Sequence, residues 1–519
     1  MDHLAGTEGG SYGGREVSDI RDTRVAIRFG GSSYTTTPPY HPARRYPEYP
    51  FDDALGNEPN PAYDLVHDLF VALNFDSSNA GTARWNPLGY LIRPGNTVLL
   101  KPNFVVSRHG RGGDLFSAIT HPSVLRALLD YAFIALEGNG RLIIADSPQM
   151  DCDWEELMRA TRLDLVSEFY RRRAGIEVEL LDLRDFAMID PNDVAYSTNR
   201  KPLPGDPLGE VVFDLGDRSH FAGLRGESSF YGADFNRAET IRNHSGGSHR
   251  YGVSRTVLGA DAVLSVPKLK VHKKVGVTLN TKGLVGITTK KNYLVHYRLG
   301  SPSAGGDQLP NGLPSTDRAI VRVQRYLFDK LLARQTTLGD LAYRAARSVY
   351  RNVVRRFVRR SRVASDFDGG NWHGNDTAWR MALDLLKIFL YGDVEGRLHS
   401  RPQRKMLCII DGIVAGENDG PLFPDAKPVG CLIGGINPLA VDLVATRLMG
   451  FDPSRVPQFR ALEDSRGFDW GFRVPSEIEV LADDPEMRRL FESEEPFLAF
   501  IPHPGWTGYI EPRATHISH

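Results

Sequence analysis

The chain has 519 residues, enough for two or three domains or for one large domain with insertions. Hydrophobic residues make up 41% and charged residues 24%, which excludes a mostly disordered chain and one built of membrane spans. The net charge of -1 gives no bulk electrostatic reason to expect a nucleic-acid partner.

The first 50 residues are expected to form a flexible or extended arm that lies on a larger body, because they are rich in Gly, Pro and Tyr. No apolar core of a signal peptide and no apolar run of roughly 18 residues occurs. We therefore expect a cytoplasmic protein, with contact to the inner face of a membrane left open. The three cysteines are far apart and form no C-x-x-C pair, so neither disulfides nor a built-in iron-sulfur cluster are expected.

The first regular unit has β-α-β spacing. Residues 97–101 predict a buried strand, His121-Pro122 opens a helix that runs to about Leu136, and residues 141–146 predict the next strand. This arrangement predicts two parallel strands, with Lys101 and Asp146 at their carboxyl ends.

Similar strand patterns occur at residues 177–181, 210–215, 262–266, 406–410 and 429–433. Asn437-Pro438 supplies a cap and a first-turn proline for a helix through Met449. The Gly-rich residues 411–420 are expected to be a flexible loop. Together these patterns predict an α/β fold, with an open mixed, largely parallel sheet and flanking helices. Residues 51–320 and 366–519 would build it in two parts, separated by a helical basic insertion at residues 321–365.

Within this insertion, residues 338–358 have the apolar period of a helix. Between Arg322 and Arg362 there are twelve arginines or lysines and two acids, Asp329 and Asp340. Two interpretations remain open. The apolar stripe packs on the protein and leaves the arginines in water, which is the commoner outcome, or residues 338–362 lie on an anionic membrane surface.

Basic side chains crowd one short segment that follows the strand at residues 262–266. Like charges repel one another, so a fold that keeps them together offsets the repulsion with carboxylates or a bound anion. The alternative is a solvated loop, the usual place for a run of charge. The residues concerned are Lys268, Lys270, His272, Lys273 and Lys274, with Lys282 nearby.

Carboxylates follow several of the expected strands. Asp146 precedes Ser147, and Asp411 and Asp419 flank the Gly-rich segment. In an open α/β sheet, ligands gather beyond the carboxyl ends of the strands, so these acids are candidates for acid-base work or metal binding. His121 lies at a helix start, where exposed amide groups attract anions.

An ordered series of motifs resembles the bacterial and archaeal family called domain of unknown function 362. The motifs are Lys101-Pro102-Asn103, Thr120-His121-Pro122, Val266-Pro267-Lys268-Leu269-Lys270-Val271-His272, Gly276-Val277-Thr278-Leu279-Asn280-Thr281-Lys282-Gly283, Asp411-Gly412-Ile413 and Asn437-Pro438-Leu439-Ala440-Val441-Asp442. Some relatives carry a ferredoxin-like cysteine cluster, which this chain lacks. The tract from Gly370 to Arg380 is similar to longer relatives associated with cell-surface polysaccharide or specialised-metabolite pathways. The resemblance implies no single activity.

The leading hypothesis is an enzyme that acts on a small anionic substrate, phosphorylated or carboxylated. Its expected catalytic residues are Lys268, His272, Asp411 and Asp419. The expected substrate-binding residues are Lys101, Asn103, His121, Asp146, Ser147, Lys270, Asn280, Lys282 and Asn437. A divalent ion held by Asp411 or Asp419 is one candidate cofactor, and a buried lysine acting as base or nucleophile is an alternative. Other hypotheses are a non-catalytic scaffold at the membrane surface and a metal-binding protein.

Overall fold

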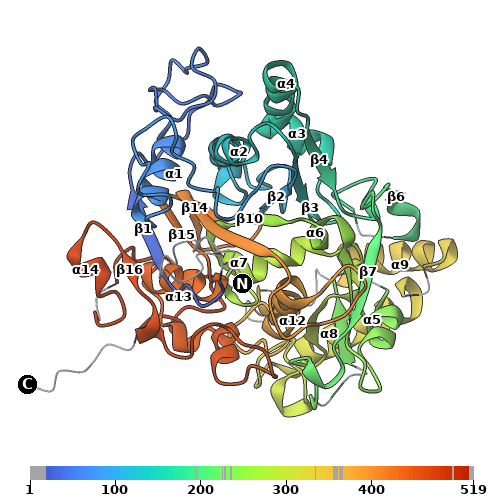
Figure 1. Ribbon diagram of the computed structural model, residues 1–519. Coiled ribbons are helices and arrows are strands. Elements are labelled where there is room, and N and C mark those ends of the chain that lie inside the picture. Colours follow the sequence, from blue (N-terminus) through green and yellow to red (C-terminus); the bar gives the residue numbers. More distant parts are fainter. Residues whose placement is uncertain are drawn as a thin grey trace, which may run out of the picture.

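The structure is a computed structural model that describes residues 19–193, 196–224, 226, 229–233, 236–333, 335–354, 361, 366–493 and 496–512. A ten-stranded mixed sheet forms its centre (Figure 1). Its strands are β1 (Val25–Phe29), β2 (Thr97–Pro102), β3 (Arg141–Asp146), β4 (Val178–Asp182), β10 (Ala262–Val266), β11 (Lys268–His272), β12 (Gly276–Val277), β14 (Lys405–Glu417), β15 (Asp425–Gly435) and β16 (Val480–Leu481).

The strand order is β16-β1-β15-β14-β10-β2-β3-β4. Neighbours from β14 to β4 run parallel, whereas β15 is antiparallel to both β14 and β1. The expected mixed, largely parallel α/β sheet is therefore confirmed, and segments far apart in the sequence build it. β1 lies within the first 50 residues, the segment expected to be an arm.

Helices cover both faces of the sheet. Alternate strand residues such as Val98 and Leu99 enter two separate hydrophobic cores, as expected for a parallel sheet buried on both sides. One face carries α1 (Pro61–Ala72), α2 (Pro122–Leu136), α3 (Trp154–Thr161) and α4 (Leu163–Ala174), and the other carries α7 (Leu279–Gly283), α12 (Ala378–Tyr391) and α13 (Pro438–Leu448).

The β-α-β unit at residues 97–146 and the helix capped by Asn437 are confirmed. Pro122 and Pro438 each occupy the first turn of a helix, and the side chains of His121 and Asn437 accept hydrogen bonds from its first amides. The strand expected at residues 210–215 forms, but it pairs in a separate two-stranded sheet.

The prediction of a loop at residues 411–420 is wrong over most of its length, because β14 continues to Glu417. Its glycines serve close packing. A Cβ atom on Gly412 would lie 2.7 Å from Cys431 Sγ, and one on Gly416 would lie 2.5 Å from the Ser117 carbonyl oxygen. Glycine is therefore needed there because neighbouring segments approach the strand closely.

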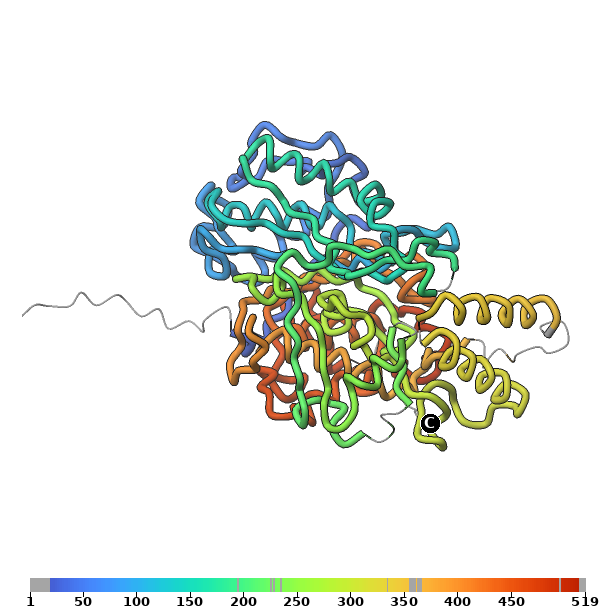
Figure 2. Tube along the Cα trace, turned by 90° about the vertical axis from the view of Figure 1, so that its right-hand side faces the viewer, coloured from blue at the N-terminus to red at the C-terminus, as the bar shows by residue number. Residues whose placement is uncertain are grey.

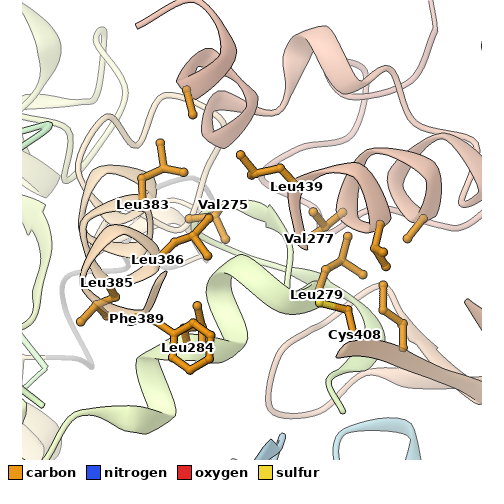
Figure 3. Packing of buried hydrophobic residues seen from close by; sticks show 14 of the residues in the cluster. Val275, Val277, Leu279, Leu284, Leu383, Leu385, Leu386, Phe389, Cys408 and Leu439 are labelled. Atoms are coloured by element: carbon orange, nitrogen blue, oxygen red, sulfur yellow. The ribbon is translucent and has the colours of Figure 1, made fainter. Parts of the chain in front are cut away.

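The long strand β14 has two partners in turn. Its first half pairs with β10 and its second half with β11, and Pro267 separates those two strands. Beyond β11, α7 packs between α12 and α13. Leu284, just after α7, lies beside Phe389 of α12, and Leu279 lies beside Val277 and Cys408 (Figure 3). This packing fixes the backbone that carries Lys282.

The other strands and α-helices lie outside the ten-stranded sheet. The strands are β5 (Phe186–Met188), β6 (Arg200–Pro202), β7 (Glu210–Asp214), β8 (Phe230–Gly232), β9 (Arg250–Ser254) and β13 (Val295–Arg298). The helices are α5 (Arg237–Asn243), α6 (Arg255–Leu258), α8 (Ser315–Leu327), α9 (Thr337–Val349) and α14 (Pro485–Arg488). Every helix in the described part of the chain is too short or too polar to cross a membrane.

Candidate functional site

A cavity of about 440 Å³ lies where the chain leaves β2 and β3, beside β11 and α7. This is the carboxyl edge of the parallel strands, where open α/β sheets bind ligands. Seven basic side chains lie on its wall, together with the carboxylates of Asp146, Asp151 and Asp193. The basic side chains are Lys270, Lys273, Lys274, Lys282, Lys291, His272 and His296.

The carboxylate of Asp146 in this cavity is already neutralised. Lys101 Nζ lies 2.8 Å from Asp146 Oδ1, and both side chains are buried. The backbone amides of Phe104 and Ser147 also donate to this carboxylate, at 2.6 and 2.7 Å. Burial raises the pKa of Asp146, and the charge of Lys101 opposes that rise. Asp146 therefore has little charge left to balance the other lysines.

Lys270, Lys282 and Lys291 have no such carboxylate within the described residues. Lys270 Nζ donates to the carbonyl oxygens of Ala118 (2.5 Å) and Pro421 (3.0 Å), and Lys291 Nζ donates to that of Ser147 (2.8 Å). Burial lowers the pKa of Lys270 well below its usual value, that of Lys282 to about 8 and that of Lys291 to about 7. Carbonyl groups satisfy hydrogen bonds but leave the positive charge unbalanced.

Lys273 and Lys274 add to this charge. Lys274 Nζ donates to Asn371 Oδ1 at 2.9 Å and to the Gly369 carbonyl. Burial lowers the pKa of both lysines, and for Lys273 the charges of Asp419 and Asp151 oppose the shift. An anion in the cavity would reverse these shifts, because a nearby opposite charge favours the charged form of a lysine.

The two cavity histidines have different tautomers. The Lys274 amide donates to His272 Nδ1 at 3.0 Å, so the neutral ring carries its proton on Nε2. His296 Nδ1 donates to the Leu294 carbonyl at 3.2 Å, which leaves a lone pair on Nε2. Burial, together with nearby lysine charges, lowers the pKa of both rings well below 6.5. At neutral pH the cavity thus has one imidazole donor and one imidazole base.

Three polar oxygens on the wall have no hydrogen-bond partner within the described residues. They are the hydroxyls of Ser147 and Thr278 and the amide oxygen of Asn103. Buried polar atoms normally have a partner, so a ligand or water is expected to contact them.

Lys268 and Asp411 form a second cluster that is closed to solvent. Lys268 Nζ lies 3.0 Å from Asp411 Oδ2, and both side chains are 0% exposed. Tyr34 Oη donates to Asp411 Oδ1 at 2.6 Å and accepts from Lys268 Nζ at 2.6 Å. The backbone amide of His121 donates to Asp411 at 3.0 Å, and its ring stacks on Tyr34. Neither the acid nor the lysine lines the cavity.

The other expected site residues form hydrogen bonds or ion pairs with residues away from the cavity. Asp419 pairs with Arg111 at 2.6 Å, and a hydrogen bond from His503 lowers its pKa. Asn280 bonds Ser265 and Asp442. Asn437 caps α13 and donates to the carbonyl oxygens of Ile20 and Trp470.

Six of the expected site residues therefore line the cavity together: Asn103, Asp146, Ser147, Lys270, His272 and Lys282. Lys101 lies behind them as the partner of Asp146. The sequence prediction missed Thr278, Lys291 and His296. The basic pair Lys290-Lys291, so close after the first cluster, was the available signal for one of them. Nowhere in the described ranges do three His, Cys, Asp or Glu side chains gather as metal ligands.

Comparisons with known proteins support the resemblance seen in the motifs. Residues 223–447 match the family model described as Domain of unknown function (DUF362). A shorter stretch of 57 residues is 39% identical to the thylakoid-associated protein sll1697 of Synechocystis sp., and covers 11% of this chain and 18% of that protein. No solved structure matches the chain. The resemblance to the domain of unknown function 362 family is thus confirmed for residues 223–447 of this chain.

Proposed function

We propose that the chain is an enzyme that binds a small phosphorylated molecule in the cationic cavity. The observation that carries this proposal is the gathering of five lysines around one cavity, three of them buried and two half-buried, while the carboxylate of Asp146 is already paired with Lys101. Buried charge is costly unless an opposite charge accompanies it. A multiply charged anion would supply that charge.

The donors on the wall suit phosphate. Arginine holds carboxylates and phosphates through two parallel bonds, whereas lysine binds phosphate as a point charge. The cavity is lined by lysines and by no arginine among the described residues. A phosphate carries close to two negative charges at neutral pH, and about 440 Å³ suits a small molecule.

The histidines supply the chemistry in this proposal. His296 Nε2 would accept a proton from the substrate, and His272 Nε2 would donate a hydrogen bond to a developing negative charge. An anion would raise the pKa of His296 toward neutrality, where a general base works best. Lys291 is a second candidate base, because burial lowers its pKa to about 7.

The name of the Synechocystis relative, a thylakoid-associated protein, supports the alternative of a protein at the membrane surface. That support covers 11% of the chain. Membrane contact and anion binding concern different residues, so separate experiments test them. A divalent ion at Asp411 or Asp419 stays a prediction.

Isothermal titration with pyrophosphate, inorganic phosphate and citrate tests the proposal. We expect pyrophosphate to bind, and Lys291→Met to weaken its binding about tenfold or more, because a charged hydrogen bond contributes 1.5–3 kcal/mol or so. The matched control is Lys290→Met. In the wild-type chain Lys290 pairs with Asp185 at 3.3 Å and lies off the cavity wall. Equal affinity of both variants would overturn the proposal, and a clear preference for citrate would make the substrate a carboxylate.

A further inference from the structure

The helical insertion presents its apolar side to solvent. On α9, the exposed fractions are 79% for Leu338, 61% for Leu341 and 56% for Val349, and Val353 in the following π-helical turn is 51% exposed. Spacings of three, four and eight place these side chains on one face of a helix. Figure 2 shows this region, drawn in yellow, standing out from the body of the protein. Over residues 338–353, the part of the stripe that the structure describes, the commoner arrangement with the stripe packed on the core does not occur.

The opposite side of α9 holds the helix to the protein. Asp340 is buried and accepts hydrogen bonds from Ser197 Oγ (2.5 Å) and the Thr198 amide (3.0 Å). Tyr343 packs against the rings of Tyr196 and Phe328. A surface helix normally buries its apolar stripe and exposes its polar face, so the orientation of α9 is reversed.

Arg344 and Arg347 reinforce this attachment. They lie 3.5 and 3.1 Å from the carboxylate of Asp193, a residue that also lines the cationic cavity. The orientation of α9 is therefore set by specific polar contacts, and rotation of the stripe inward would break them. A large exposed apolar surface of this kind marks an interaction site.

The exposed charge of this region is positive. The acids of this region have partners inside the protein: Asp329 binds Tyr231 and Arg237, and Asp340 binds Ser197 and Thr198. By contrast, basic side chains of α8 and of the turns that follow α8 and α9 are exposed. These are Arg318, Arg322, Lys330 and Arg351. α8 adds exposed apolar residues at Val323 and Tyr326.

We propose that α9 docks on an anionic membrane, with Leu338, Leu341, Val349 and Val353 inserted at the boundary between headgroups and acyl chains. Aliphatic side chains beside several cations are the combination that binds such surfaces. Each basic residue near the surface contributes on the order of 1 kcal/mol, and salt weakens that contribution. An acidic protein partner or a second copy of this chain is the competing occupant.

Co-sedimentation with vesicles tests this proposal on the full chain. We expect binding to vesicles of phosphatidylcholine and phosphatidylglycerol in a three-to-one ratio, and little binding to phosphatidylcholine alone. Leu338→Ser with Leu341→Ser and Val349→Ser should lower the partition coefficient about tenfold or more, because the inserted apolar area is lost. Replacement of Arg318, Arg322 and Arg351 by glutamine should do the same, most clearly at low salt.

A matched control replaces exposed apolar residues elsewhere, Val71, Leu208 and Ile501, by serine and should bind like the wild type. Thermal unfolding and pyrophosphate titration should be unchanged in all variants, which separates docking from folding and from the cavity. Absence of co-sedimentation of the wild-type protein with anionic vesicles would overturn the proposal. A wild-type dimer in light scattering that becomes a monomer in the triple serine variant of Leu338, Leu341 and Val349 would also overturn the proposal.

Discussion

Two lysines of one strand, Lys268 and Lys270, have opposite surroundings. Both lie in β11, two residues apart, and both are 0% exposed. Lys268 meets the carboxylate of Asp411 and the hydroxyl of Tyr34, whereas Lys270 meets two backbone carbonyls beside the cavity. One charge is balanced inside the fold and the other is not.

The difference arises from partners that lie far away in the sequence. Asp411 reaches Lys268 because β14 changes partners from β10 to β11 at Pro267, which places Lys268 directly opposite Asp411. Two residues after Lys268 in β11, a shift in register places Lys270 opposite Gly416 of β14. A structural ion pair and a candidate anion site therefore share one strand, and the residue on the neighbouring strand decides between them.

The closed cluster should show the largest effect on stability. Asp411→Leu leaves Lys268 buried without a counter-charge, so we expect the free energy of unfolding to fall by about 3–5 kcal/mol. Urea denaturation measures this loss. The double variant Lys268→Met with Asp411→Leu removes both charges and should recover most of it.

A double variant as unstable as the single one would show that the pair does more than balance charge. Retained pyrophosphate binding in the double variant is also expected, because this cluster lies off the cavity wall.

Gly286→Ala perturbs the ion pair between Lys101 and Asp146 at the cavity wall. A Cβ atom at this position would lie 1.9 Å from Asp146 Oδ1 and 2.5 Å from Lys101 Nζ, so the pair must move. We expect a loss of about 1–3 kcal/mol in unfolding free energy and weaker pyrophosphate binding. Gly283→Ala is the matched control, since its Cβ would meet Pro267 at an ordinary 3.5 Å. Equal losses in both variants would contradict this view of Gly286.

The fold could be predicted in part because short local sequence patterns are enough to identify its central strands and two capped helices. Residues 97–146 and the Asn437-Pro438 cap are examples. The strand conformation of the Gly-rich segment after Ile410 could not be predicted in this way. Its glycines are needed because Cys431 and Ser117, which are distant in the sequence, pack closely against them. Composition alone makes such a segment look like a loop.

The site was predicted only in part for the same reason. The motif around Lys270, His272 and Lys282 contains three side chains that line the cavity. Which lysines are balanced depends on pairing between distant strands, and His296 enters the wall from β13, outside every motif. Charge spacing therefore locates the lysine cluster more reliably than it assigns roles within it.

Proton uptake on binding gives the smallest but most specific signal of unbalanced charge. At pH 8, Lys282 with a pKa of about 8 is half protonated and Lys291 with a pKa of about 7 is mostly neutral. A phosphate would raise both pKa values, so these two lysines together should take up about one proton on binding. Titrations in two buffers with different ionisation enthalpies measure that number.

The same two lysines set the sign of the pH dependence without ligand. Their pKa values are lower in the folded chain than the 10.5 of an unfolded lysine, so between pH 7 and 10.5 the unfolded chain holds more protons. Their contribution to the free energy of unfolding therefore rises with pH in this window. The variant Lys282→Met with Lys291→Met should flatten the rise and lower the proton uptake by about one, whereas Lys268→Met with Asp411→Leu should leave the proton uptake unchanged. If the cavity variant takes up as many protons with pyrophosphate as the wild type does, the charge that the anion balances lies on other residues than these lysines.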